Sequence, residues 1–177
     1  SPDGTRVVFV SNRDTGQDQI FWRLADGTGP IDSLFSEEHR FMVPSTWSMD
    51  GNSLVFSYVS GDEGISNDIG IVSLDGNWDP LLATSAVEAG PSVSPDGNWI
   101  AYMSDESGQF EVYARPFPNV DGGRWQISRA GGLAPKWAPD GGALYFFNGN
   151  STQMMVAAVE TDSTFSPGNP EGLFSLV

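Results

Sequence analysis

Carboxylates are the most abundant charged groups in this chain, in which 23 Asp and Glu residues stand against 8 Lys and Arg and one His. Four aspartates occupy the same place in a recurring pattern, which reads SPDG at 1–4 and 94–97, SMDG at 48–51 and APDG at 138–141. Clustered carboxylates serve acid–base catalysis or bind Ca²⁺. The pattern is therefore either a repeated reactive loop or a repeated structural turn.

The spacing and the neighbours of these aspartates favour a turn. They are 47, 46 and 44 residues apart, a period typical of repeat architectures. Proline presets the first turn position, aspartate bonds neighbouring backbone N–H groups, and glycine adopts the left-handed conformation that closes a hairpin. We therefore predict four structural turns, called the Asp-Gly turns below, built on Asp3, Gly4, Asp50, Gly51, Asp96, Gly97, Asp140 and Gly141.

Catalytic constellations are not found in the sequence. The single imidazole, His39, lies in the polar stretch SEEHRF, and we interpret it as a loop histidine without a triad. There is no cysteine, no G-x-S-x-G elbow and no glycine-rich phosphate loop with its lysine. We therefore predict a protein that is not an enzyme, has no catalytic residues and uses no cofactor.

Two oxygen-rich segments, SGDEG at 60–64 and SDESG at 104–108, are the candidates for a Ca²⁺ site. Neither has the D-x-[DN]-x-[DN]-G spacing of a calcium loop, and Asp, Ser and Gly dominate turns for conformational reasons alone. We predict hairpin turns and no metal site. The net charge of −15 repels phosphate backbones and anionic membranes, so nucleic acid is not an expected partner. Apolar runs shorter than ten residues predict no membrane insertion.

The segments between the turns predict strands. Stretches such as NWIAYMS at 98–104 and QFEVYAR at 109–115 are rich in β-branched and aromatic residues, and polar breaks separate them. Nearly continuous apolar runs, as in VVFV at 7–10, predict burial on both faces of the sheet. No stretch shows convincing helical periodicity. Trp47 and Trp137 are predicted to pack inside, whereas Trp78 and Trp125, near outer turns, are predicted to face the surface.

Repeated four-stranded sheets that cover one another describe a β-propeller. We predict an all-β chain with one propeller-type domain over 1–177 and four antiparallel blades, bounded approximately at 1–42, 43–87, 88–130 and 131–177. The first blade begins at its turn and lacks its innermost strand. We therefore expect a partial ring that belongs to a longer propeller or closes as a homo-oligomer.

The repeat resembles that of the TolB family and its WD-repeat-like relatives. The resemblance rests on SPDGTRVVFVSNRDTGQDQIFWRL at 1–24, WSMDGNSLVFSYVSGDEG at 47–64, PSVSPDGNWIAYMSDESGQFEVYARP at 91–116 and KWAPDGGALYFF at 136–147. The region from 113 to 147 is also similar to propellers that follow the kinase domain in some bacterial serine/threonine kinases. This likeness implies a propeller fold and favours a periplasmic or other extracytoplasmic location.

The function that these patterns favour is a binding or scaffolding module for a protein or peptide partner. By propeller geometry, the loops between second and third strands and the connections between blades share one end of the molecule. The binding candidates there are Arg13, Asp14, His39, Arg40, Asp62, Glu63, Asp105 and Glu106, with Glu88, Arg129 and Asn148 to Ser151 beside them. The alternatives are a sensing or substrate-gating propeller of a larger kinase or hydrolase, and a small-ligand or cation site in an acidic channel.

Overall fold

The computed structural model of the chain describes residues 1–177 except 14–15, 36–40, 61–65, 162–163 and 177. Within this described part the fold is all-β, as predicted, and the one helix is a single 3₁₀ turn, Val120–Gly122. No helix in these residues is therefore long and apolar enough to cross a membrane.

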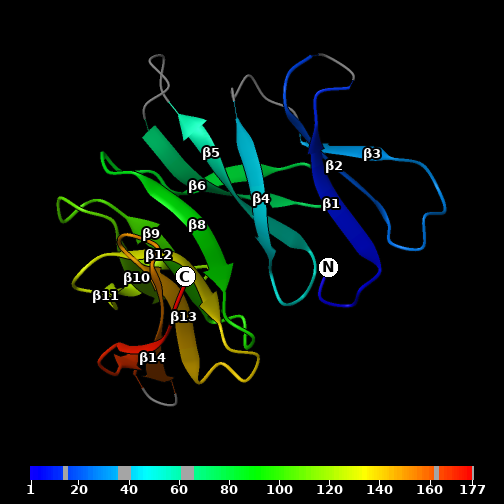
Figure 1. The fold of residues 1–177 in the computed structure, drawn as a ribbon. Helices are drawn as coiled ribbons and strands as arrows, with labels where there is room; N and C mark the ends of the chain where they lie inside the picture. Colours follow the sequence, from blue (N-terminus) through cyan, green and yellow to red (C-terminus); the bar gives the residue numbers. More distant parts are fainter. Residues whose placement is uncertain (14–15, 36–40, 61–65, 162–163, 177) are drawn as a thin grey trace.

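Successive segments of the chain form separate antiparallel sheets (Figure 1). The first sheet has three strands, β1 (Arg6–Ser11), β2 (Gln19–Leu24) and β3 (Asp32–Phe35). The second has four, β4 (Met42–Trp47), β5 (Ser53–Ser60), β6 (Ser66–Ser73) and β7 (Trp78–Leu82). In the first sheet β1 therefore occupies the edge position that β4 takes in the second.

The third sheet repeats the four-stranded order with β8 (Glu88–Val93), β9 (Trp99–Ser104), β10 (Glu111–Pro116) and β11 (Trp125–Gln126). The fourth contains β12 (Gly132–Trp137), β13 (Ala143–Asn148), β14 (Gln153–Glu160), β15 (Ser166–Pro167) and β16 (Glu171–Ser175). Both β15 and β16 pair with β14. This sheet thus has one short strand more than the predicted four, formed by the connection that leads to β16.

The sheets follow one another around a bend, and their first strands lie on the same side. Strand β8 contacts both β4 and β12. Each of these three strands has a register shift at a proline, namely Pro44, Pro91 and Pro135. Because proline cannot donate a ladder hydrogen bond, it is tolerated in a sheet at such irregularities. The repeat thus extends to the backbone of the innermost strands.

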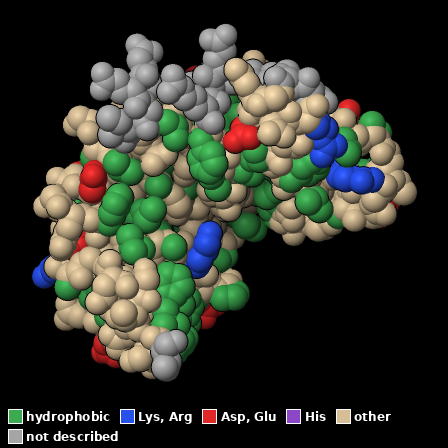
Figure 2. All heavy atoms as spheres, turned by 45° about the horizontal axis from the view of Figure 1, so that its top comes forward, with side chains coloured by type: hydrophobic (Ala, Val, Ile, Leu, Met, Phe, Trp, Pro, Cys, Tyr) green, Lys and Arg blue, Asp and Glu red, His purple; other side chains and the backbone are tan. Residues whose placement is uncertain are grey.

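Each pair of neighbouring sheets encloses its own hydrophobic cluster, so the inner sheets are buried on both faces. In β5, Phe56 packs between the first and second sheets, whereas its neighbour Val55 packs between the second and third. Leu144 and Phe146 of β13 pack against the third sheet. Two-sided burial explains the nearly continuous apolar runs of the sequence. Figure 2 shows further hydrophobic side chains exposed on both arms of the bent molecule.

The prediction that Trp78 and Trp125 face the surface is wrong. The ring of Trp78 lies 5.2 Å from that of Phe35 in the first sheet, and the ring of Trp125 lies 5.5 Å from that of Trp99. Both tryptophans are partly buried against the clusters, as are Trp47 and Trp137, for which packing was correctly predicted. Strand β7 begins at Trp78, so this residue belongs to the sheet and its indole packs against the core.

Candidate interaction surface

The Asp-Gly turns use their aspartates to hold the backbone. In the third turn, Asp96 Oδ1 accepts hydrogen bonds from the Ser94 hydroxyl and from the Asn98 N–H at 3.1 Å, while Oδ2 accepts from Asn98 Nδ2 at 2.9 Å. The Trp99 N–H donates to Ser94 Oγ at 3.0 Å, and Gly97 has a φ of +75°. The serine therefore contributes to the turn as much as the aspartate does.

These hydrogen bonds also determine the charge of the turns. The Ser48 hydroxyl and the Asn52 amide groups hold the pKa of Asp50 below its ordinary value. Burial raises the pKa of Asp96, but bonds from Ser94 and Asn98 outweigh it, and the pKa is lowered there too. Carboxylates stabilised in the ionised form are poor proton donors near neutral pH. The aspartates of the second and third turns therefore act on the backbone as ionised hydrogen-bond acceptors.

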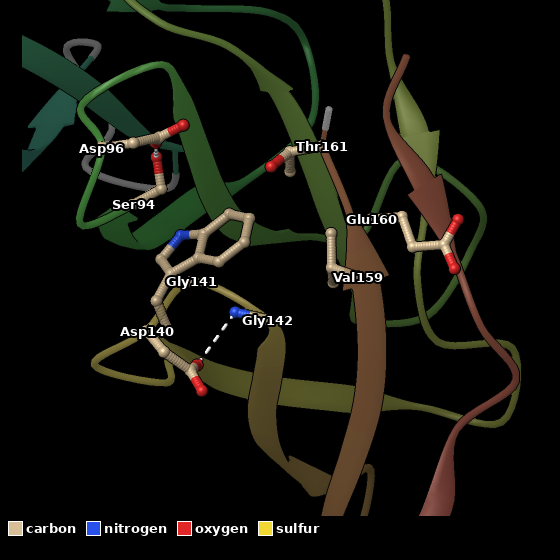
Figure 3. A pocket seen from close by; sticks show the side chains of 9 residues that line it. Ser94, Asp96, Asp140, Gly141, Gly142, Val159, Glu160 and Thr161 are labelled. Carbon is tan, nitrogen blue, oxygen red and sulfur yellow. Dashed lines mark hydrogen bonds between the residues drawn. The ribbon is translucent and has the colours of Figure 1, made fainter. Parts of the chain in front are cut away.

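A cavity of about 290 Å³ lies between the third and fourth turns (Figure 3). Asp140, on one of its walls, accepts a hydrogen bond from the Gly142 N–H at 3.0 Å. The Trp137 indole N–H donates to the Ser92 carbonyl at 2.9 Å. Figure 3 shows the carboxylate of Glu160 directed away from Asp96 and Asp140. This turn-end cavity has carboxylates on its walls, but the hydrogen bonds of the two turns already use both aspartates.

The opposite end of the sheets carries the loops predicted to bind a partner, and we call it the loop end. Five of the predicted residues, Asp14, His39, Arg40, Asp62 and Glu63, lie outside the described residues. Arg13 lies over the rings of Phe9 and Phe21, with its guanidinium carbon 5.1 and 5.3 Å from their centroids. Its role as a binding residue stays a prediction.

Three more of the predicted residues, Asp105, Glu106 and Glu88, have bonded partners in the structure. Asp105 Oδ1 accepts a hydrogen bond from the Val87 N–H at 2.8 Å and so ties the β9–β10 loop to the preceding connection. Glu106 forms an ion pair with Arg124. Glu88 is buried, and burial raises its pKa although the Thr84 hydroxyl and N–H bond to its carboxylate. Burial, with the charges of Asp68 and Glu88, raises the pKa of Tyr58 to about 12.

A second cavity, of about 520 Å³, opens among these loops, and we call it the loop-end cavity. It lies between the third and fourth sheets, where the β9–β10 loop, the β11–β12 connection and the β13–β14 turn meet. Its volume is within the range of about 300–1,000 Å³ that ligand pockets occupy. The lining residues include none with a charged side chain and are Gln109, Phe110, Ala130, Gly131, Asn148, Gly149 and Asn150.

One buried carboxylate holds the walls of the loop-end cavity together. Glu111, the first residue of β10, is 1% exposed. Its Oε1 accepts hydrogen bonds from Gln109 Nε2 at 2.6 Å and from the Gly131 N–H at 3.0 Å, and its Oε2 accepts from the Ser128 hydroxyl. The Ser128 oxygen in turn accepts from the Val112 N–H at 2.8 Å. Glu111 therefore joins the third sheet to the connection that enters the fourth.

The far wall is built by close backbone contact and by asparagine. A Cβ added to Gly131 would lie 2.5 Å from Gly149 Cα, so only glycine allows this approach. Asn148 Oδ1 accepts hydrogen bonds from the N–H groups of Thr152 at 2.8 Å and Gln153 at 3.1 Å. Asn148 and Asn150 lie within the predicted binding loop, whereas no sequence pattern assigned a role to Gln109, Phe110 or Glu111. The only local signal was the glutamate itself, which directly precedes the apolar stretch Val112 to Ala114 of β10.

Solved structures similar to this chain have TolB-type folds. They include a protein provisionally assigned as TolB from Agrobacterium tumefaciens, with a TM-score of 0.78 and 24% identity, and TolB from Acinetobacter baumannii, with 0.72 and 20%. The chain has a TolB-like β-propeller fold. A puromycin-hydrolyzing peptidase from Mycobacterium tuberculosis is also similar, with a TM-score of 0.65 and 16% identity. No family model matches the chain.

The TolB-like likeness covers nearly all of this chain but only part of the similar proteins. It spans 99% of the chain and 63% of the Agrobacterium structure, 98% and 42% for the Acinetobacter protein, and 98% and 30% for the peptidase. An uncharacterized protein of Agrobacterium fabrum is 27% identical over 99% of the chain and 60% of its own length. The chain thus spans less than two thirds of the length of each of these proteins.

Proposed function

We propose that this chain is a non-catalytic binding or scaffolding module whose loop end contacts a protein or peptide partner. The observation that carries the proposal is the loop-end cavity, a recess of ligand size built where three loops of a rigid β-scaffold meet. The buried carboxylate of Glu111 bonds to Gln109 and Gly131 and so holds two of the cavity's walls together. The TolB-like fold supports a module of this kind, and the uncharged lining suits the neutral polar surface of a polypeptide.

A sensing or substrate-gating domain of a larger enzyme is the second candidate. The similarity to a peptidase favours it, because the chain matches 30% of that protein and leaves room for a separate catalytic part. In this case the loop-end cavity receives a segment of the substrate or of the attached domain. Both candidates place binding at the loop end, and they differ in what the rest of the parent protein contains.

We further propose that each of the four predicted units supplies one sheet of an incomplete propeller. Support comes from a row of apolar side chains across the open face of the fourth sheet. Leu133 lies opposite Phe147, Phe147 opposite Met154, and Met154 opposite Phe174, so the four share one face. Phe174 is 54% exposed. Such a row suits packing against a further sheet, from a longer propeller or from a second copy of the chain.

The binding proposal predicts that ligands protect the loop end alone. Because the chain has no cysteine, Ser107→Cys in the β9–β10 loop and Asn119→Cys in the β10–β11 connection each introduce a single reporter. We expect phage-displayed random peptides selected on the immobilised chain to slow alkylation of the first thiol at least tenfold and to leave the second unchanged. Alkylation kinetics with an excess of selected peptide provide the measurement. Protection of the second thiol alone, or of neither, contradicts the proposal.

Self-association is expected if the apolar row on the open face of the fourth sheet packs against a second copy of the chain in solution. Light scattering of the purified chain at micromolar concentration should then give a mass above the monomer value of 19.0 kDa. Phe174→Glu should restore the monomer, because a charge in the apolar row has no partner on an apposed sheet. Ile31→Glu, at a 39% exposed residue of the first sheet's outer connection, is the matched control. A stable wild-type monomer contradicts the oligomer and leaves the longer propeller.

A further inference from the structure

We propose that the loop-end cavity binds one peptide unit of an uncharged polypeptide segment, through the free ends of the carboxamides of Gln109 and Asn150. The ring of Phe110 receives the neighbouring apolar side chain. This inference rests on the proposed function, which it deepens by naming the chemical class of the ligand and the residues that bind it. It is carried by the hydrogen bonds of the two carboxamides, by the character of the lining and by the rigidity of the walls.

Each of the two carboxamides is hydrogen-bonded within the protein through one of its two polar atoms, and the other polar atom has no partner among the described residues. Gln109 donates Nε2 to Glu111, and no described residue bonds its Oε1. Asn150 accepts at Oδ1 from the Thr152 hydroxyl at 2.6 Å and from its N–H at 3.3 Å, and its Nδ2 has no partner among the described residues. The cavity therefore presents one free acceptor and one free donor, which is the complement of a single peptide group.

The third carboxamide of the lining explains why this pair is singled out. Asn148 uses both ends internally, since its oxygen accepts from two backbone N–H groups and its Nδ2 donates to the Thr152 hydroxyl at 3.2 Å. It therefore fixes the β13–β14 turn and, unlike the other two carboxamides, has no end that is wholly unbonded among the described residues. The wholly unbonded ends belong to one residue from the third sheet's loop and one from the fourth sheet's turn.

The rest of the lining selects against charged ligands and favours an apolar neighbour. None of the seven lining residues has a charged side chain, so an ion or a phosphate would lose its hydration without gaining a counter-charge. Phe110 is half-buried, and its carbonyl accepts the Gly132 N–H at 2.9 Å, which anchors its backbone beside the cavity. An aromatic ring beside hydrogen-bonding carboxamides suits an aliphatic or aromatic side chain next to the bound peptide group.

The two binding groups are held before a ligand arrives. Glu111 is buried and bonded to three donors, and the backbone contact of Gly131 with Gly149 sets the spacing of the walls. Each exposed carboxamide is therefore already bonded at one end, so a ligand has less side-chain freedom to remove, which lowers the entropic cost of binding. This distinguishes the loop-end cavity from the turn-end cavity, where the aspartates are already engaged in their own turns.

The test uses blocked peptides and shape-matched variants. The probe is a pool of N-acetylated, C-amidated tetrapeptides of Ala, Ser, Leu and Phe, titrated into ¹⁵N-labelled chain while the side-chain amide signals of Gln109 and Asn150 are followed by NMR. Asn150→Asp keeps the size of the side chain and its acceptor for Thr152 but removes the free donor. Asn119→Asp, at an exposed position of the opposite end, adds the same charge and is the control.

We expect the peptides to shift both amide signals, with binding weakened at least tenfold by Asn150→Asp and by Gln109→Ala and unchanged by Asn119→Asp. Selected peptides that protect Ser107→Cys but bind both variants like the wild type would overturn the inference and leave the proposed function intact. Peptides that protect neither reporter thiol overturn both. Shifts produced by neutral oligosaccharides and not by the peptides assign the cavity to a sugar and overturn the peptide inference.

Discussion

Replacing Glu111 with alanine is expected to lower the free energy of unfolding by about 3 kcal/mol or more. The substitution removes the acceptor of three hydrogen bonds in a place where water cannot substitute, because the side chain is 1% exposed. It leaves the Gly131 N–H and the Ser128 hydroxyl without their partner and opens a cavity at the junction of the third and fourth sheets. Each of these effects is destabilising on its own.

Urea denaturation followed by tryptophan fluorescence measures this loss. Glu160→Ala is the control, since it removes a carboxylate of the same type from an exposed position of β14 and should change stability by about 0.5 kcal/mol at most. Glu111→Gln keeps the volume and one acceptor, so its effect should fall between the two. Equal unfolding midpoints for Glu111→Ala and Glu160→Ala would show that the carboxylate does not hold the sheets together.

The Asp-Gly turns could be predicted because their interactions are local. Ser94, Asp96 and Asn98 bond to one another within five residues. The same short motif contains Gly97, the glycine that the positive φ of the turn requires. Four copies at spacings of 47, 46 and 44 residues then imply a repeat of sheets. The sequence therefore predicts the number of units and the all-β character of the fold, and the TolB-like resemblance predicts how such sheets are arranged.

The tryptophans show where local reasoning fails. Trp78 and Trp125 stand beside turn-forming residues, which favours an exposed position when only neighbours in the sequence are considered. In the structure Trp78 meets Phe35, which lies in the preceding sheet, and Trp125 meets Phe165 at 5.3 Å, which follows β14. Packing between sheets decides the burial of these rings, and a turn motif carries no information about which sheet will cover it.

Only part of the loop-end cavity could be predicted from the sequence, because some of its hydrogen bonds are local and others join distant segments of the chain. Asn148 and Asn150 form a short turn whose hydrogen bonds are local, so a loop there is evident from the sequence. Glu111 bonds to residues 17 and 20 positions further along the chain. A glutamate inside a strand is most often on the solvent face. Its role as a buried junction becomes visible only when the third and fourth sheets are brought together.

Replacing Gly131 with alanine is the second substitution with a large expected effect. Gly131 has a φ of +89°, and an added Cβ would lie 2.5 Å from Gly149 Cα and 2.9 Å from its nitrogen. The neighbour is backbone and cannot rotate away, so the β13–β14 turn must move. We expect a loss of about 3 kcal/mol, which combines the cost of a left-handed alanine with that of the clash. In thermal unfolding this corresponds to about 6–12 °C.

Gly108→Ala separates the two contributions. Gly108 has a φ of +93°, almost the same as Gly131, but nothing lies within 4 Å of its added Cβ. It should therefore show the conformational cost alone, about 1 kcal/mol, and the difference between the two variants reports the close approach of the cavity walls. Because that approach sets the spacing between Gln109 and Asn150, Gly131→Ala should also weaken tetrapeptide binding, whereas Gly108→Ala should not. Equal losses of stability and equal binding in the two variants would show that the glycine contact does not shape the cavity.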